Sequence, residues 1–175
     1  MSVEFEIRES RAADSKAIES IYPGAFPDED LVPLVQDLLK DPDVTLSLVA
    51  TANSQIAGHV IFTRCGVVGN DLDVALLAPL AVDRPYQGEG IGSALVRAGL
   101  QRLQDAGVST VLVLGDPKYY GRFGFTAETL IEPPYPLPPQ WEGAWQSVNP
   151  GGAGKQVAGP LSVPAEWRKR ALWAP

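Results

Sequence analysis

The sequence is poor in several residue types, and each shortage removes a class of protein or site. Its 175 residues include one cysteine, one histidine and one methionine. The single cysteine, Cys65, excludes an intramolecular disulfide and suits a reducing compartment, so we expect a cytoplasmic protein. One histidine and one cysteine also cannot supply a transition-metal cluster, and we expect no metal cofactor.

Positive charge and long apolar runs are scarce too. Lysine and arginine total 14 against 21 aspartate and glutamate residues, which gives a net charge of −7. Such a balance lacks the cationic footprint that nucleic acid requires, and we expect no nucleic-acid partner. The longest apolar run, residues 74–82, is far shorter than the ~20 residues of a spanning helix. Charged residues at positions 4, 6 and 8 argue against a signal peptide, so no membrane partner is expected.

What the sequence does contain is enough apolar material for one folded domain, which we place at residues 1–175. Hydrophobic residues make up 45% of the chain, and their periodicity alternates between that of strands and that of helices. The pattern predicts an α/β fold with helices on both faces of a sheet. Strands are expected at 3–8, 45–51, 56–64, 71–83 and 110–115, with shorter pieces at 144–148 and 156–163. Helices are expected at 11–24, 31–39 and 91–106, and a stiff proline-rich loop at about 132–145.

The stretch "YQGEGIGSAL", residues 86–95, places three glycines immediately before a helical pattern. Bare backbone N–H groups at the positive end of a helix dipole form an anion site. A dinucleotide fingerprint is disfavoured because Ser93 stands where its third glycine is needed, and the loop typical of nucleoside triphosphatases is absent. A pyrophosphate held by a shorter turn is favoured over glycines that serve only tight helix packing.

Two motifs together resemble a known family. Residues 87–92, Gln-Gly-Glu-Gly-Ile-Gly, match the Arg/Gln-x-x-Gly-x-Gly/Ala signature of the GNAT N-acetyltransferase superfamily, and "YYGRFGF" resembles its second, tyrosine-containing motif. The resemblance covers residues 3 to about 131, and "LGDPKYYGRFGF" is especially similar to a bacterial YhbS-like subgroup. It implies a mixed, twisted central β-sheet flanked by helices, and transfer of an acetyl group from acetyl-CoA to a primary amine by direct attack in a ternary complex.

The resemblance also assigns cofactor contacts. It implies that backbone amides from Gly88 to Ser93 cradle the pyrophosphate, with Gln87 at the edge, and that pantetheine pairs with the backbone of the preceding strand. Pro79 independently predicts free backbone groups in that strand, because proline cannot donate to a ladder. The full expected set is Leu80, Ala81, Val82, Gln87, Gly88, Glu89, Gly90, Ile91, Gly92, Ser93 and Tyr120.

Two of these residues are expected to act in the reaction. The N–H of Val82 is the candidate donor to the thioester carbonyl. Tyr120 stands at the family position of the general acid, because it precedes the Gly124-Phe125 pair by the expected interval, whereas Tyr119 is one residue out of register and is expected to pack. Asp116 is expected to cap the short helix that carries these tyrosines.

The amine acceptor and the base are the least defined parts. Loops carry specificity, so we expect the acceptor pocket in the segments "GAFPDED" and "EPPYPLPPQWEGAW", with Glu29, Asp73 and Tyr135 as candidate substrate residues. Asp73, His59 and Glu29 are candidate bases, release of the amine's proton to water is the alternative, and Cys65 as a nucleophile is disfavoured. The acceptor is a small-molecule or peptide amine, and a homodimer stays open. The alternative function is a catalytically inactive CoA-binding module that serves regulation or interaction.

Overall fold

The computed structural model describes residues 3–152 and 156–173. It divides into two compact units, unit 1 with Met1–Thr63 and Ala78–Gly99, and unit 2 with Arg64–Leu77 and Leu100–Pro175. Neither unit is one continuous stretch of chain. The chain passes from one to the other inside three regular elements, β3 (Gln55–Val67), β4 (Val74–Val82) and α3 (Ile91–Asp105).

Unit 1 begins with three antiparallel strands in the order β1 (Glu6–Glu9), β2 (Thr45–Ala52) and β3. A two-residue turn joins β2 to β3, and its residues Asn53 and Ser54 have φ angles of 52° and 63°. Such left-handed pairs match the twist of a hairpin, as the sequence predicts for these turn residues. A 3₁₀ turn at Ala12–Asp14, α1 (Ser15–Ala25) and α2 (Val32–Leu39) lie between β1 and β2.

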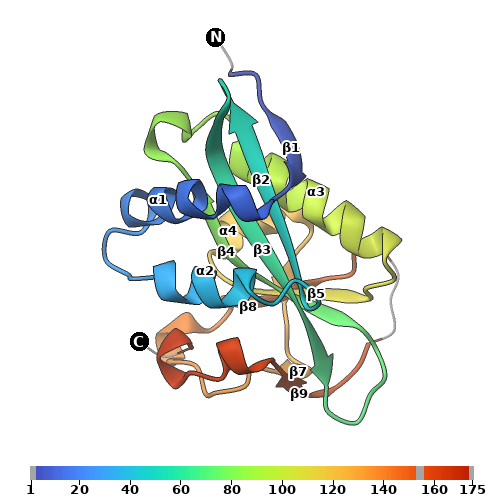
Figure 1. Cartoon of the computed structure of the whole chain (residues 1–175). Coiled ribbons are helices and arrows are strands. Elements are labelled where there is room, and N and C mark those ends of the chain that lie inside the picture. The colour runs from blue at the N-terminus through green and yellow to red at the C-terminus, as the bar shows by residue number, and fades with distance from the viewer. Residues whose placement is uncertain (1–2, 153–155, 174–175) are drawn as a thin grey trace. The chain divides into compact units, whose positions relative to one another are not determined.

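Helices cover both faces of β3 in unit 1. Successive residues of this strand point in opposite directions, and each direction meets a different helix. His59 faces α1, where its ring lies edge-on to Tyr22. Its neighbour Gly58 faces α3: a Cβ added there would lie 2.9 Å from Ile91 Cγ2. A side chain at Gly99 of α3 would overlap the ring of Phe62, which lies on the same side of β3 as Gly58. Figure 1 shows α1 and α2 crossing in front of β2 and β3.

Unit 2 combines parallel and antiparallel pairs. Residues Val74–Leu76 of β4 run parallel to β5 (Thr110–Leu114), and β5 is antiparallel to β8 (Trp145–Val148). Strand β6 (Thr126–Ala127) is also antiparallel to β8. A second group joins β7 (Ile131–Glu132), β9 (Gly159–Ser162) and the end of β3. This mixture of strand directions agrees with the predicted mixed sheet.

The elements of unit 2 outside the strands are short. Helix α4 (Pro117–Tyr120) is followed by 3₁₀ turns at Gly121–Phe123, Pro139–Trp141, Ala165–Trp167 and Arg170–Leu172. The predicted proline-rich loop is irregular between β7 and β8 apart from one of these turns. Tryptophans fill the core beside it: the Trp173 ring lies 5.7 Å from that of Trp145 and 6.0 Å from that of Trp167.

Three expectations about element boundaries need correction. The helix expected at 11–24 is a 3₁₀ turn at Ala12–Asp14 followed by α1, which ends one residue beyond the expected end, at Ala25, with Pro23 inside it. The two-residue strands β6 and β7 were not predicted, because they are too short to show a period. The fourth strand is shorter than the predicted 71–83, since it begins at Val74.

Candidate active site

The glycine-rich loop of unit 1 has the geometry of an open backbone surface. Gly88 and Gly90 have φ angles of 81° and 83°, which side-chain-bearing residues rarely adopt. Both are exposed, and a Cβ added at either position would meet no atom within 4 Å. Packing therefore does not require glycine at these two positions. The backbone conformation does, and it leaves the backbone bare at these two exposed positions.

Helix α3 begins directly at this loop. The carbonyl of Gly90 accepts the N–H of Ala94 at 3.0 Å, so Gly90 is the residue that precedes the first helical turn. The first N–H groups of a helix have no intrahelical partner and carry the positive end of its dipole. In the described structure these donors lie next to exposed glycines, and the arrangement can bind an anionic group such as a phosphate.

Gln87 fixes the loop to the end of β4. Its Nε2 donates to the carbonyl oxygen of Val82 at 3.0 Å, and between them lies a 3₁₀ turn at Arg84–Tyr86 that Asp83 caps. The side chain of Ala81 is buried in the cluster formed with α1 and α2, whereas Leu80 and Val82 are half-buried. Alternation along β4 thus sends Leu80 and Val82 to the opposite side from Ala81.

Tyr120 of unit 2 lies at the end of α4 among aromatic rings. Its ring lies against the backbone of Gly115, where an added Cβ would collide with it, and 5.7 Å from the ring of Phe125. Burial raises the pKa of Tyr120 above its ordinary value, and the neighbouring Tyr119 raises it further, so the phenol is protonated at neutral pH. Among the described residues the Tyr120 hydroxyl has no hydrogen-bond partner.

The residues that flank Tyr120 in the sequence have clear structural roles. Asp116 caps α4 through an Oδ1 that accepts the N–H of Lys118 at 2.9 Å, which confirms the expected capping role. Gly124 has a φ angle of 93° and ends the 3₁₀ turn, and the following Phe125 is buried. The Gly-Phe pair therefore turns the chain back and secures it in the core of unit 2.

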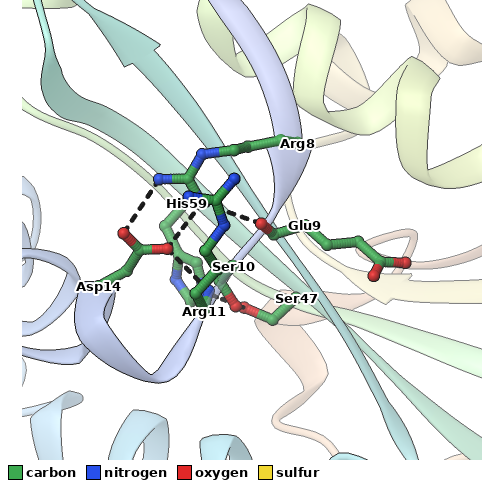
Figure 2. Close-up of polar contacts among 7 residues, drawn as sticks. All are labelled: Arg8, Glu9, Ser10, Arg11, Asp14, Ser47 and His59. Atoms are coloured by element: carbon green, nitrogen blue, oxygen red, sulfur yellow. Dashed lines mark hydrogen bonds and ion pairs between the residues drawn. The ribbon is translucent and has the colours of Figure 1, made fainter.

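His59, one of the candidate bases, occupies a closed polar network instead. Its side chain is fully buried, Nδ1 lies 2.7 Å from the Tyr22 hydroxyl, and Nε2 lies 2.8 Å from Ser47 Oγ. Ser10 Oγ donates to Ser47 Oγ at 2.7 Å (Figure 2). Burial lowers the pKa of His59 to about 3, only partly offset by the charge of Asp14. A neutral imidazole with both nitrogens engaged serves structure rather than proton abstraction.

An ion pair secures the chain beside this network. The Arg8 guanidinium donates to both carboxylate oxygens of Asp14, at 2.7 and 3.0 Å, and Asp14 also accepts the N–H of Arg11 (Figure 2). These bonds to the charged carboxylate, with Arg8 as the largest cause, hold the pKa of Asp14 below its ordinary value. They fix the turn that leads from β1 into α1.

Comparison with known proteins identifies the family. The model of the acetyltransferase (GNAT) family matches residues 15–125. The chain belongs to this family. It is 41% identical over 120 residues, 68% of this chain and 72% of its relative, to a protein of Escherichia coli K12 described as the uncharacterized N-acetyltransferase YhbS. The GNAT family and the YhbS-like resemblance predicted from the sequence are therefore confirmed.

Two solved GNAT structures agree with the fold over nearly the whole chain. One is E. coli YhbS in complex with CoA, with a TM-score of 0.83, 32% identity, and coverage of 97% of this chain and 94% of that one. The other is a GNAT acetyltransferase from Brucella melitensis in complex with acetyl-CoA, with a TM-score of 0.74, 29% identity, and coverage of 94% and 98%. The predicted α/β class, with a mixed sheet flanked by helices, is confirmed, as is the enzyme class of N-acetyltransferase.

The candidate acceptor residues lie in separate parts of this GNAT fold. Glu29 is exposed between α1 and α2 in unit 1. In unit 2, Tyr135 is half-buried in the proline-rich stretch, and the exposed Asp73 precedes β4, its carboxylate 4.0 Å from Arg64 Nη1. The whole length of β4 therefore separates Asp73 from Val82. Burial raises the pKa of the Cys65 thiol to about 12, which agrees with its rejection as a nucleophile.

Sequence reasoning missed the role of Arg84. This exposed residue precedes the glycine-rich loop, and its Nε donates to the carbonyl of Gly24 in α1 at 2.8 Å. Nothing in the local pattern signals the contact, because the partner is 60 positions away.

Among residues 3–152 and 156–173, no group of three or more potential ligands that could hold a metal ion is found. In the same ranges no helix has the length and hydropathy to cross a membrane.

Proposed function

We propose that this protein transfers the acetyl group of acetyl-CoA to a primary amine by direct attack in a ternary complex. The observation that carries the proposal is the exposed glycine-rich loop, with positive φ at Gly88 and Gly90, immediately before α3. Backbone amides from Gly88 to Ser93 bind the pyrophosphate of the cofactor there, and Gln87 holds the loop against β4. The bound CoA and acetyl-CoA of the two GNAT neighbours support the same cofactor here.

The pantetheine arm pairs with the backbone of β4 in this proposal. Leu80 and Val82 offer their half-buried side, while Ala81 turns its methyl group into the core of unit 1. The N–H of Val82 donates to the thioester carbonyl and stabilises the negative charge that forms on its oxygen during attack. The Ile91 side chain is buried beneath the loop, so Ile91 contributes through its backbone alone.

Tyr120 supplies the proton for the leaving group. The amine nitrogen attacks the thioester carbon, the carbon–sulfur bond breaks, and the sulfur takes the phenolic proton while the amine's excess proton passes to water. The raised pKa keeps the Tyr120 phenol protonated at neutral pH until the thiolate leaves. The lack of a protein partner for the hydroxyl supports this role.

The acceptor is a small-molecule or peptide amine. The exposed acidic turn that includes Glu29 attracts its positive charge, and Tyr135 in the proline-rich stretch forms part of an apolar wall. The amine's excess proton passes to water, because the whole length of β4 separates Asp73 from Val82, the proposed donor to the thioester carbonyl. The whole chain, residues 1–175, acts as a single domain and works in the cytoplasm, where its one cysteine stays reduced.

A product-detecting mass-spectrometry screen tests this function. Amine mixtures are incubated with acetyl-CoA and either the natural chain or a variant whose segment from Pro134 to Pro139 is replaced by a Gly-Ser link. We expect acetylated products from the natural chain and a changed acceptor profile from the variant, with unchanged acetyl-CoA affinity. Tight acetyl-CoA binding without any acetylated product would favour the alternative of a CoA-binding module, and an unchanged profile would remove the proline-rich stretch from the acceptor site.

A further inference from the structure

The end of α1 is held by two contacts to different parts of unit 1. On one side, the Tyr22 hydroxyl is hydrogen-bonded to Nδ1 of His59 in β3 at 2.7 Å. Two residues later, the carbonyl of Gly24 accepts the N–H of Arg84 Nε at 2.8 Å. Carbonyls in the last turn of a helix lack intrahelical donors and attract cations, so the guanidinium stabilises this end.

Arg84 belongs to the turn that leads into the glycine-rich loop. Its own N–H donates to Asp83 Oδ1 at 3.0 Å, and its carbonyl accepts the N–H of Gln87 at 3.3 Å. The N–H of Asp83 donates in turn to the carbonyl of Ala57 in β3 at 2.8 Å. The backbone of Arg84 is therefore fixed between the sheet and the proposed pyrophosphate loop, while its side chain reaches α1.

The same end of α1 sets the path of the segment between α1 and α2. The N–H of Phe26 donates to the carbonyl of Tyr22 at 2.8 Å, and their rings stack with centroids 6.1 Å apart. Phe26 and Leu31 pack on the core of unit 1, and the residues between them, 27–30, are exposed. The acidic turn at residues 27–30 therefore lies between two packed residues, Phe26 and Leu31, and Phe26 is two positions beyond Gly24.

We propose that Arg84 is a positioning residue that couples the cofactor loop to the acidic turn at residues 27–30. The inference rests on the proposed function, in which the loop binds acetyl-CoA and the turn receives the amine. When acetyl-CoA fixes residues 87–93, Arg84 holds Gly24, and with it Phe26 and the turn, in one arrangement. Cofactor binding thereby orders the acceptor side before the amine arrives.

Amide hydrogen exchange tests the coupling directly. In the natural chain, we expect saturating acetyl-CoA to slow exchange across residues 26–31 by about fivefold, the lower end of coupling between linked sites. Arg84→Met keeps the length of the side chain without its donor, and should slow exchange there less than twofold while still slowing it in the loop. Arg84→Lys retains a donor for one carbonyl and should restore most of the effect.

Lys16→Met is the matched control, because it removes one exposed positive charge from α1 and should keep the full response. In amine acetylation, Arg84→Met should raise the KM for the amine about fivefold, through the lost coupling, and leave the acetyl-CoA Kd within twofold. Equal slowing across residues 26–31 in the natural chain and Arg84→Met would overturn the coupling. So would a large loss of acetyl-CoA affinity, which would make Arg84 a cofactor ligand. If acetyl-CoA does not bind the natural chain at all, the proposed function itself fails.

Discussion

Two tyrosines, the fully buried Tyr22 and the half-buried Tyr120, show how the same side chain serves structure in one place and is left available in another. The Tyr22 hydroxyl of unit 1 is bonded to His59 at 2.7 Å, whereas the Tyr120 hydroxyl of unit 2 has no partner among the described residues. Burial raises the pKa of both phenols, so the protonation state does not distinguish them. The difference lies in what surrounds the hydroxyl.

Around Tyr22, each polar side chain is hydrogen-bonded to the next one. Ser10, Ser47, His59 and Tyr22 form a continuous hydrogen-bonded chain, which satisfies the buried imidazole on both sides. Around Tyr120, the neighbours are the rings of Tyr119, Phe123 and Phe125. The Tyr120 hydroxyl is not among the buried unpaired polar atoms of the described residues, so it reaches the surface of its aromatic cluster, where a ligand or a reacting group can meet it.

Removing the Tyr120 hydroxyl tests this contrast with the largest expected effect. Tyr120→Phe should lower kcat by about 100-fold or more, the usual range for loss of a general acid, with acetyl-CoA Kd and thermal stability nearly unchanged. Steady-state kinetics with an amine from the screen and calorimetry with acetyl-CoA provide the measurements. Tyr119→Phe is the matched control, since the Tyr119 ring packs under the Arg122 guanidinium at 4.6 Å and is expected to do no more. Equal losses in the two variants would contradict the assignment.

A substitution at Gly90 tests the open backbone in the same spirit. Asparagine tolerates positive φ better than other residues, so Gly90→Asn preserves the loop path and adds a side chain on its exposed side. We expect acetyl-CoA affinity to fall by about 100-fold, because a cradle of backbone N–H groups works only if the phosphates can approach it.

The control for Gly90 is Gly107, at the other end of α3. It has a φ of 85° and, like Gly90, would place an added Cβ more than 4 Å from any neighbour. Gly107→Asn should therefore keep full affinity in calorimetry. If Gly90→Asn binds acetyl-CoA normally, glycine is required at this position only for its backbone conformation, and the pyrophosphate binds elsewhere.

The parts of the site that the sequence predicted are those set by neighbouring residues. Helix α3 was expected to end near Ala106, and it does end at Asp105, because Gly107 in a left-handed conformation stops it. The capping of α4 by Asp116 is equally local. The contacts of His59 with Tyr22 and of Arg84 with Gly24 join residues 37 and 60 positions apart, so no window of sequence contains both partners.

Acid should unfold the protein through His59 before the carboxylates of the ion pair respond. The folded pKa of about 3 lies well below the ordinary 6.5, so between these values the unfolded chain binds a proton that the folded chain does not. The stability associated with the neutral imidazole is complete above pH 6.5 and declines as the pH falls, by about 1.4 kcal/mol per pH unit.

Urea unfolding of the natural chain and of His59→Gln at pH 6.5 and pH 5 measures this decline. We expect the free energy of unfolding to fall by about 2 kcal/mol more in the natural chain than in the variant, because only the natural chain has the titrating imidazole. The remaining carboxylates titrate in both proteins and cancel in the difference. Parallel declines would mean that His59 is accessible to protons in the folded state.

A loss of stability with the smallest effect on turnover is expected from removing the hydroxyl of Tyr22, which completes the contrast with Tyr120. Tyr22→Phe keeps the ring that packs with Phe26 and leaves His59 Nδ1 buried without a partner. An unsatisfied buried group costs about 1–3 kcal/mol, and urea unfolding at pH 7 should show a loss in that range. Tyr86→Phe is the control, because Tyr86 is half-buried and has no side-chain hydrogen bond within the described chain.

Tyr22 contributes to stability and not to proton transfer. At temperatures where Tyr22→Phe is folded, it should therefore keep kcat within about threefold, whereas loss of a general acid lowers kcat by about a hundredfold or more. A kcat loss as large as that of Tyr120→Phe, in a folded Tyr22→Phe protein, would show that the hydrogen-bonded chain through His59 takes part in the reaction.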